Sequence, residues 1–196
     1  MYPRRILCIA AGILLAAGSA HAADIAAGKA AAEPCAACHG ADGVSATERV
    51  PSLAGQPDQF IQWQLVYYRS GTRNDEVMEP LAENLSDADI RNLGAYYASL
   101  PPPPPTQQSD GNPALSQKGA EIIAGDKCGS CHQERFTGQQ ATPRLAGQRE
   151  EYLLKALQDF KSGARRGGGV GAMPSATYRL SDDDMTALAH YLARVQ

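Results

Sequence analysis

Two short segments of this chain each combine two thiols and an imidazole: Cys35-Ala36-Ala37-Cys38-His39 and Cys128-Gly129-Ser130-Cys131-His132. Cysteines three positions apart lie on one side of a helical turn, where each sulfur can form a thioether with one vinyl group of a haem. The histidine that follows is then placed to offer a nitrogen to the haem iron. The repeated C-x-x-C-H pattern therefore predicts two covalently attached haem c groups, bound through Cys35, Cys38, Cys128 and Cys131.

Zinc binding and dithiol redox chemistry are the alternatives for paired cysteines. Two C-x-x-C pairs that share a zinc ion usually lie about 15–20 residues apart, whereas these pairs begin at residues 35 and 128. Structural zinc also needs four converging ligands, and no strand–helix–strand pattern of the thioredoxin type surrounds either motif. Haem attachment is the favoured interpretation.

The two halves of the chain repeat each other beyond these motifs. PSLAGQ at residues 51–56 matches PRLAGQ at residues 143–148, and Leu-Ser-Asp at 85–87 matches Leu-Ser-Asp at 180–182. The nearly constant spacing between the copies indicates duplication of one module. A module of about 80 residues is marginal for an unaided core, so we expect each half to need its haem in order to fold.

The second axial ligand of each iron decides between electron transfer and ligand binding at an open site. Met78 and Met173 lie at the same distance before the Leu-Ser-Asp sequence of their halves, in stretches expected to be irregular. Thioether sulfur is a soft ligand, and Met/His ligation raises the reduction potential of a haem. We therefore predict His39 with Met78, and His132 with Met173, as axial pairs. The alternative for either methionine is an adaptable core residue.

A supporting role is predicted for Pro51 and Pro143, which open the repeated hexapeptides. A haem histidine usually donates its other N–H group to a carbonyl or carboxylate, which fixes the imidazole ring. Both prolines follow their histidines at similar distances. A rigid turn is the alternative role, and the two roles are compatible.

The hydrophobic periodicity is helical throughout, without an alternating strand pattern. The predicted helices before and after the haem motifs cover residues 24–34, 57–70, 114–127 and 149–162. The last helix of each half opens at Ser86 or Ser181, each followed three residues later by Asp as in a capping box. The fold class is therefore all-α.

Residues 1–22 have the pattern of a secretory signal peptide. Arg4 and Arg5 precede an apolar run, and Ala-His-Ala forms a small-x-small cleavage site. The run is shorter than the about 20 residues of a membrane span, so we expect export to the periplasm. Two modules at residues 23–100 and 113–196 follow, joined by a linker at residues 101–112 that contains five consecutive prolines and acts as a semi-rigid strap.

Charge is distributed unevenly between the modules. Residues 23–100 contain five Lys or Arg and eleven Asp or Glu, a net charge of −6, whereas residues 118–196 contain eleven and nine, a net charge of +2. A nucleic-acid-binding protein would show a concentrated basic face, so this class is excluded. The asymmetry can orient the molecule as it meets a charged partner, or it only keeps the surface solvated.

CAACHGADG at residues 35–43, the two hexapeptides, the Met-to-LSD spacing and the tandem arrangement resemble the dihaem class I cytochromes c of the cytochrome c4 family. The resemblance covers nearly all of the chain after residue 22. It implies two tandem cytochrome-c-like haem domains joined by the proline-rich linker, with the axial pairs named above. The departures are the five-proline linker and Gln133, which stands where the first motif is followed by Gly40.

The resemblance further implies a periplasmic electron carrier that exchanges single electrons with terminal oxidases, other respiratory complexes or periplasmic dehydrogenases. It leaves peripheral membrane association open. We expect no enzymatic activity, because no Ser/His/Asp set, phosphate loop or pair of acids stands out. The alternatives are an electron-accepting cytochrome subunit of a periplasmic dehydrogenase complex and, less favoured, a dihaem peroxidase, which needs one open iron.

Overall fold

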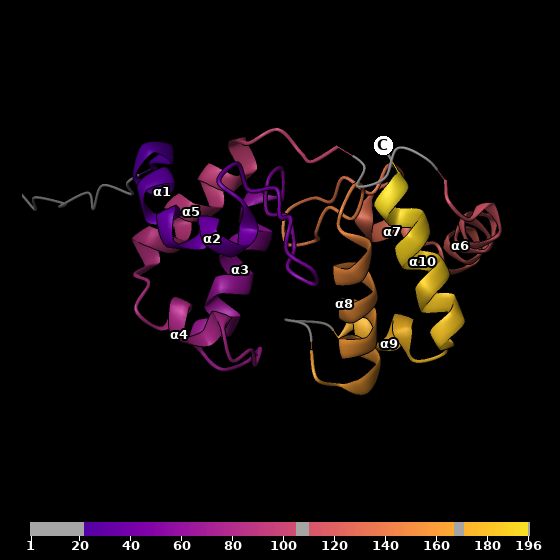
Figure 1. Ribbon diagram of the computed structural model, residues 1–196. Helices are drawn as coiled ribbons and strands as arrows, with labels where there is room; N and C mark the ends of the chain where they lie inside the picture. The colour runs from indigo at the N-terminus through magenta and orange to yellow at the C-terminus, as the bar shows by residue number, and fades with distance from the viewer. Residues whose placement is uncertain (1–21, 105–109, 167–170, 196) are drawn as a thin grey trace, which may run out of the picture.

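The computed structural model describes residues 22–104, 110–166 and 171–195. Within these ranges the chain is helical, apart from loops and an isolated bridge between Gln139 and Thr142. Figure 1 shows two groups of helices side by side: α1 to α5 in indigo to magenta, which we call module 1, and α6 to α10 in red through orange to yellow, which we call module 2. The all-α, two-module architecture predicted from the sequence is confirmed.

The helices of module 1 are α1 (Ile25–Ala31), the 3-10 helix η1 (Glu33–Cys35), α2 (Ala36–His39), α3 (Asp58–Arg69), α4 (Met78–Glu83) and α5 (Asp87–Ser99). Those of module 2 are α6 (Pro113–Asp126), α7 (Gly129–His132), α8 (Glu150–Ser162), α9 (Ala172–Thr177) and α10 (Asp182–Arg194). The order of the α-helices repeats, and α2 to α5 match α7 to α10 in length to within one residue, as expected for a duplication. The first helices differ, because α6 has 14 residues whereas α1 has seven and is followed by η1.

The stretches that carry Met78 and Met173 are short helices, which corrects the expectation that they are irregular. The carboxylate of Asp75 accepts hydrogen bonds from the amides of Val77 and Met78 and so satisfies amides at the start of α4. The proline of each stretch lies in the first helical turn, where its missing N–H costs little. A proline near the methionine is therefore compatible with both helices.

The last helix of each module starts with a complete capping box, as predicted. The hydroxyl of Ser86 accepts from the amide of Asp89, whose carboxylate accepts from the amide of Ser86. Ser181 and Asp184 repeat this arrangement in α10. Each cap contributes on the order of 1 kcal/mol to stability, so the start of both helices is fixed by local interactions.

A glycine lets the first and last long helices of each module cross closely. A Cβ on Gly28 of α1 would lie 2.1 Å from the carbonyl oxygen of Asn92 in α5, and one on Gly119 of α6 would lie 2.5 Å from that of Ala187 in α10. The cores formed around these crossings contact Cys35 in module 1 and Cys128 in module 2. The helix crossing therefore positions the first cysteine of each haem motif.

The described part of the proline linker packs against both copies of the repeated hexapeptide. A Cβ on Gly55 would lie 2.7 Å from Cβ of Pro102, and one on Gly147 would lie 2.9 Å from the carbonyl oxygen of Pro103. Both glycines have a positive φ, 67° and 69°. The linker is therefore a strap in contact with both modules, although residues 105–109 lie outside the described part.

The predicted signal peptide, except for Ala22, also lies outside the described residues. Among the helices that are described, none is both long enough and apolar enough to cross a membrane.

Candidate haem sites

Both haem motifs lie in short helical segments that follow the first α-helix of their module. Cys35 ends η1 and Cys38 lies in α2, while Cys128 caps α7 and Cys131 lies within it. The first cysteine of each pair is half-buried and the second is exposed. Burial raises the pKa of the Cys35 and Cys128 thiols, which keeps them neutral at physiological pH. A macrocycle joined to both sulfurs would have one edge against the module core and one at the surface.

Each motif histidine is buried and bound through one ring nitrogen. His39 Nδ1 donates to the carbonyl oxygen of Pro51 at 2.8 Å, and His132 Nδ1 donates to that of Pro143 at 3.0 Å. The predicted role of the two prolines is confirmed. With the proton on Nδ1, the lone pair of Nε2 is free to bind a metal. Burial lowers the pKa of both imidazoles, which favours the neutral form that binds iron.

The loop after each histidine brings the proline back to the ring. Gly40 follows His39 with φ 84° and ψ 148°, and Gln133 follows His132 with φ 70° and ψ 157°. Three residues later, the carbonyl of Gly43 accepts from two amides of the first hexapeptide, and that of Phe136 accepts from two amides of the second. These bonds tie each hexapeptide to its haem motif.

Met78 is half-buried at the first position of α4, which packs against α3. The Asp75 carboxylate accepts from the Met78 amide at 3.0 Å, and its charge opposes the lowering of the pKa of His39 by burial. Asp75 therefore connects the methionine segment electrostatically to the histidine.

Met173 is half-buried at the second position of α9, which packs against α8, and its carbonyl accepts from the Thr177 hydroxyl at 3.0 Å. Residues 167–170, shortly before α9, lie outside the described part. Met185, in contrast, is fully buried in the core of α10. Its position identifies it as a packing residue, which separates it from the two ligand candidates.

The modules meet through two glutamines that sequence reasoning did not assign a role. The side chain of Gln148 accepts from the Ser52 amide at 2.8 Å and donates to the Ser52 carbonyl at 2.9 Å. Gln56 does the same to Arg144, accepting at 3.0 Å and donating at 2.9 Å. Each is the last residue of its copy of the repeated hexapeptide. The presence of glutamine at this position in both copies was the feature of the sequence that could have indicated a shared role.

Two equivalent arginines also meet where the modules touch. The guanidinium groups of Arg73 and Arg165 each lie 4.6 Å from the centre of an aromatic ring of their own module. Both donate to Gln64 Oε1, at 2.7 and 2.9 Å, and both approach the hydroxyl of Tyr152 at 3.4 Å. Burial alone would raise the pKa of Tyr152, but the two cations bring it to about 8.

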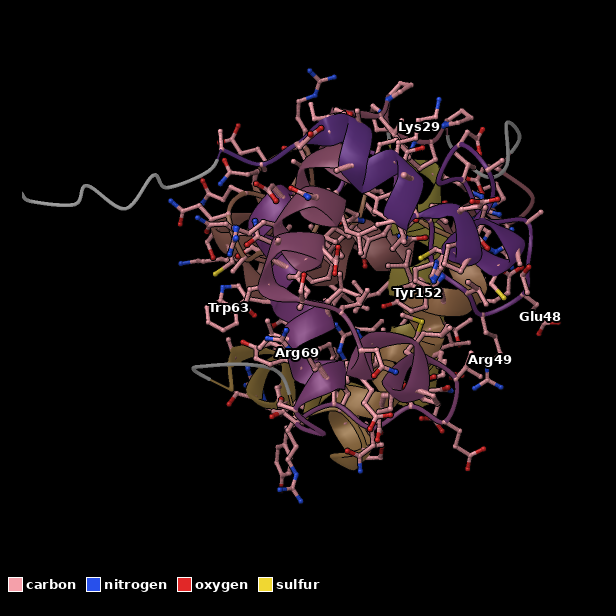
Figure 2. The ribbon with its side chains drawn as sticks, turned by 90° about the vertical axis from the view of Figure 1, so that its left-hand side faces the viewer. Lys29, Glu48, Arg49, Trp63, Arg69 and Tyr152 are labelled. Atoms are coloured by element: carbon pink, nitrogen blue, oxygen red, sulfur yellow. The ribbon has the colours of Figure 1, made fainter. Side chains whose placement is uncertain are left out.

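Figure 2 looks onto module 1 from its outer side, with Tyr152 of α8 labelled behind it. Tyr152 lies near the centre of the view, whereas Trp63, Glu48 and Arg49 lie at the rim. The side chain of Trp63 is 47% exposed and stacks on Tyr67. The hydrogen bonds between the modules are buried or partly buried, whereas α3 presents the aromatic side chain of Trp63 to solvent.

Comparison with known proteins gives consistent matches. A family model of cytochrome c matches residues 25–101 and again residues 116–196. Cytochrome c4 of Pseudomonas aeruginosa is 37% identical over 186 residues, which cover 89% of this chain and 90% of that protein. The thiosulfate dehydrogenase electron acceptor of Thiomonas intermedia is 33% identical over 177 residues, 83% of this chain and 78% of that protein.

The fold agrees with these sequence matches. The crystal structure of reduced recombinant cytochrome c4 from Pseudomonas stutzeri matches with a TM-score of 0.82 and 30% sequence identity, covering 89% of this chain and all of that one. Each matched segment contains one C-x-x-C-H motif with a buried histidine whose Nε2 is available to a metal. The donor set fits haem c at both sites. The chain therefore binds two covalent haem c groups and belongs to the cytochrome c family, in its dihaem cytochrome c4 group.

Proposed function

We propose that this protein carries electrons between respiratory components, one electron per haem, and makes and breaks no substrate bonds. The observation that supports this most strongly is the repetition of one complete haem site, in which each buried histidine is fixed through Nδ1. When bound, haem supplies the one-electron chemistry of its iron. The residues of the chain hold that iron in a constant environment.

The proposed ligands follow the repeat. Thioether bonds are assigned to the four motif cysteines, and iron ligation is assigned to the two pairs His39 with Met78 and His132 with Met173. Fast electron transfer requires little change in geometry between the two oxidation states of the iron. The carbonyls of Pro51 and Pro143 restrain the imidazoles, and the short helices α4 and α9 restrain the methionine backbones.

An electron-accepting subunit of a periplasmic dehydrogenase complex is the second candidate function. It is favoured by one specific observation, the similarity to a protein named thiosulfate dehydrogenase electron acceptor. The haems and ligands would be unchanged, but the chain would depend on a fixed catalytic partner. Co-purification of a dehydrogenase subunit with this chain at constant stoichiometry would favour this function over a freely diffusing carrier.

We place the protein in the periplasm because residues 1–22 have the pattern of a signal peptide. The mature chain would then consist of the modules 23–100 and 113–196 and the linker 101–112. Its partners would be redox proteins such as a terminal oxidase, another respiratory complex or a periplasmic dehydrogenase. The net charge of −6 on residues 23–100 would orient module 1 toward a basic partner surface.

A carbon monoxide titration of the reduced mature protein, together with a count of covalent haems by mass spectrometry, tests the proposal. We expect two haems and no carbon monoxide binding, because both irons have two protein ligands. Binding at one haem would show an open iron. That outcome would replace electron transfer by ligand sensing or peroxidase activity as the proposed function.

A further inference from the structure

The peptide group between Pro51 and Ser52 is hydrogen-bonded at both ends, to two different modules. Its carbonyl accepts from His39 Nδ1 at 2.8 Å, within module 1. Its N–H donates to Oε1 of Gln148, in module 2, at 2.8 Å. One peptide group thus links the candidate ligand histidine of the first haem to a side chain of the second module.

The same connection exists in the opposite direction. The peptide group between Pro143 and Arg144 accepts from His132 Nδ1 at 3.0 Å through its carbonyl, and donates its N–H to Oε1 of Gln56 at 3.0 Å. These residues are equivalent in the repeat. Each haem histidine is therefore connected, through a single peptide group, to the last residue of the hexapeptide in the other module.

Both glutamine side chains are held in one orientation. Their Nε2 groups donate to the carbonyls of Ser52 and Arg144, so each amide binds the opposite backbone at two points. Gln56 and Gln148 are each 4% exposed and Ser52 is 1% exposed. In such a low-dielectric environment, hydrogen bonds in series polarise one another.

Polarisation of the peptide group changes the histidine. When its N–H is bound by the glutamine oxygen, the peptide carbonyl becomes a stronger acceptor for the Nδ1 proton. A stronger acceptor makes the imidazole a more basic ligand, and a more basic ligand stabilises ferric iron relative to ferrous iron. The glutamine therefore lowers the reduction potential of the haem whose histidine it reaches.

We propose that Gln56 and Gln148 are positioning residues that tune the haem of the opposite module. Gln148 acts through the Pro51–Ser52 peptide on His39, and Gln56 acts through the Pro143–Arg144 peptide on His132. The inference rests on the proposed ligation of iron by the two histidines. It assigns to the interface a role in setting potentials in addition to holding the modules together.

The test is the pair of variants Gln148→Met and Gln56→Met in the holoprotein, with the potential of each haem resolved by NMR-monitored redox titration. Methionine has a similar length but neither accepts nor donates like an amide. In Gln148→Met we expect the reduction equilibrium constant of the first haem to rise about threefold, or about 28 mV at 59 mV per tenfold. In Gln56→Met we expect this shift at the second haem. The NMR signal of the affected Nδ1 proton should move with it.

A shift in the potential of the opposite haem distinguishes an effect through the peptide group from a general weakening of the contact between the modules. Gln64→Met is the matched control, because it removes the hydrogen bonds from Arg73 and Arg165 at the same interface and contacts neither peptide group that accepts from a histidine. A loosened interface would give the same shifts in all three variants. The proposal is overturned if Gln64→Met shifts the potentials as much as the other two variants do. It is also overturned if each variant shifts the haem of its own module, or if no potential shifts.

Failure of the proposed function gives a different result. Carbon monoxide binding or a missing haem in the unaltered protein contradicts the assigned ligation, whatever the potentials of the variants. If the unaltered protein has two haems that bind no carbon monoxide, but the variants do not shift the potential of the opposite haem, only the role of the glutamines is contradicted.

Discussion

The first four residues after His39 and after His132 form the same turn with different residues. Module 1 uses Gly40 and Gly43, with φ of 84° and 76°, whereas module 2 uses Gln133 and Phe136, with φ of 70° and 54°. Glycine adopts such angles freely, but other residues do so at a cost on the order of 1–3 kcal/mol. Module 2 keeps the turn in spite of this cost, so contacts with the rest of the module, and not the local residue preference, determine the loop conformation.

The side chain of Phe136 shows what offsets the cost in module 2. It is buried in the core with Ala146 and Leu192. In module 1 a Cβ on Gly43 would lie 3.1 Å from Cδ1 of Leu100, so that volume is already filled from the end of α5. The two modules fill the same space from different parts of the chain.

Removal of one sulfur ligand should break the equivalence of the two haem sites most strongly. We expect Met78→Ala to open the first haem only and Met173→Ala to open the second only, with one carbon monoxide bound per reduced protein in each. The potential of the opened haem should fall by more than about 59 mV, a tenfold change in its reduction equilibrium, because Met/His ligation raises it.

Met185→Leu is the control, since Met185 packs in the core of module 2. It should bind no carbon monoxide and leave both potentials unchanged. If Met173→Ala also remained closed to carbon monoxide, the ligand assignment in module 2 would be wrong.

Exchange of the residues after the two histidines tests how much strain each loop carries. We expect Gly40→Gln to destabilise the holoprotein by about 3 kcal/mol, because the positive φ is costly for glutamine and a Cβ would lie 2.1 Å from the Val44 carbonyl oxygen. We expect Gln133→Gly to stabilise the holoprotein by about 1 kcal/mol. The substitution relieves the strain of the positive φ, and the greater conformational entropy of glycine in the unfolded chain offsets part of this gain.

Denaturant unfolding of both variants, followed by far-UV circular dichroism, measures these changes. Equal destabilisation by the two substitutions would show that Gln133 makes contacts that outweigh its strain.

The smallest expected difference concerns the capping carboxylates of the last helices. The ion pair with Lys118, at 2.8 Å, and the bonds to Ser181 lower the pKa of Asp184 to about 2. The pKa of Asp89 is lowered by its bonds to Ser86. The stabilisation by Asp184 is therefore present above its ordinary pKa of about 4 and is lost as the pH falls toward 2.

Lys118→Met should raise the pKa of Asp184, leave that of Asp89 unchanged and cost about 0.5 kcal/mol at neutral pH, as is usual for exposed ion pairs. An NMR titration of the two carboxyl groups measures both values. No movement of the Asp184 pKa would mean that the cap alone lowers it.

Features that depend on residues close in sequence were predictable. The C-x-x-C-H spacing, the Pro51 and Pro143 carbonyls that accept from the histidines, and both capping boxes follow from local geometry. The helix at Met78 was missed because its first amides are satisfied by Asp75, a residue outside the helix. The ligand roles of Met78 and Met173 stay predictions.

Features that depend on how the modules meet were not predictable. The repeat indicated a duplication but not which face of each module is buried, so the roles of Gln56 and Gln148 could not be inferred. His190 is buried, with its ring nitrogens 3.3 Å from Glu150 and 3.1 Å from Asp110. Its partners come from α8 and the linker, which are distant in sequence.

The exchange of glutamines has a consequence for the origin of the molecule. Each module gives the other the same hydrogen bonds that it receives, which is the property of an isologous contact between two identical subunits. A single ancestral module with this hexapeptide would hold both halves of that contact and could pair with a copy of itself. Gene fusion would then have added only the strap, and divergence of the two halves, as at Gly40 and Gln133, would have followed once a single chain enforced the pairing.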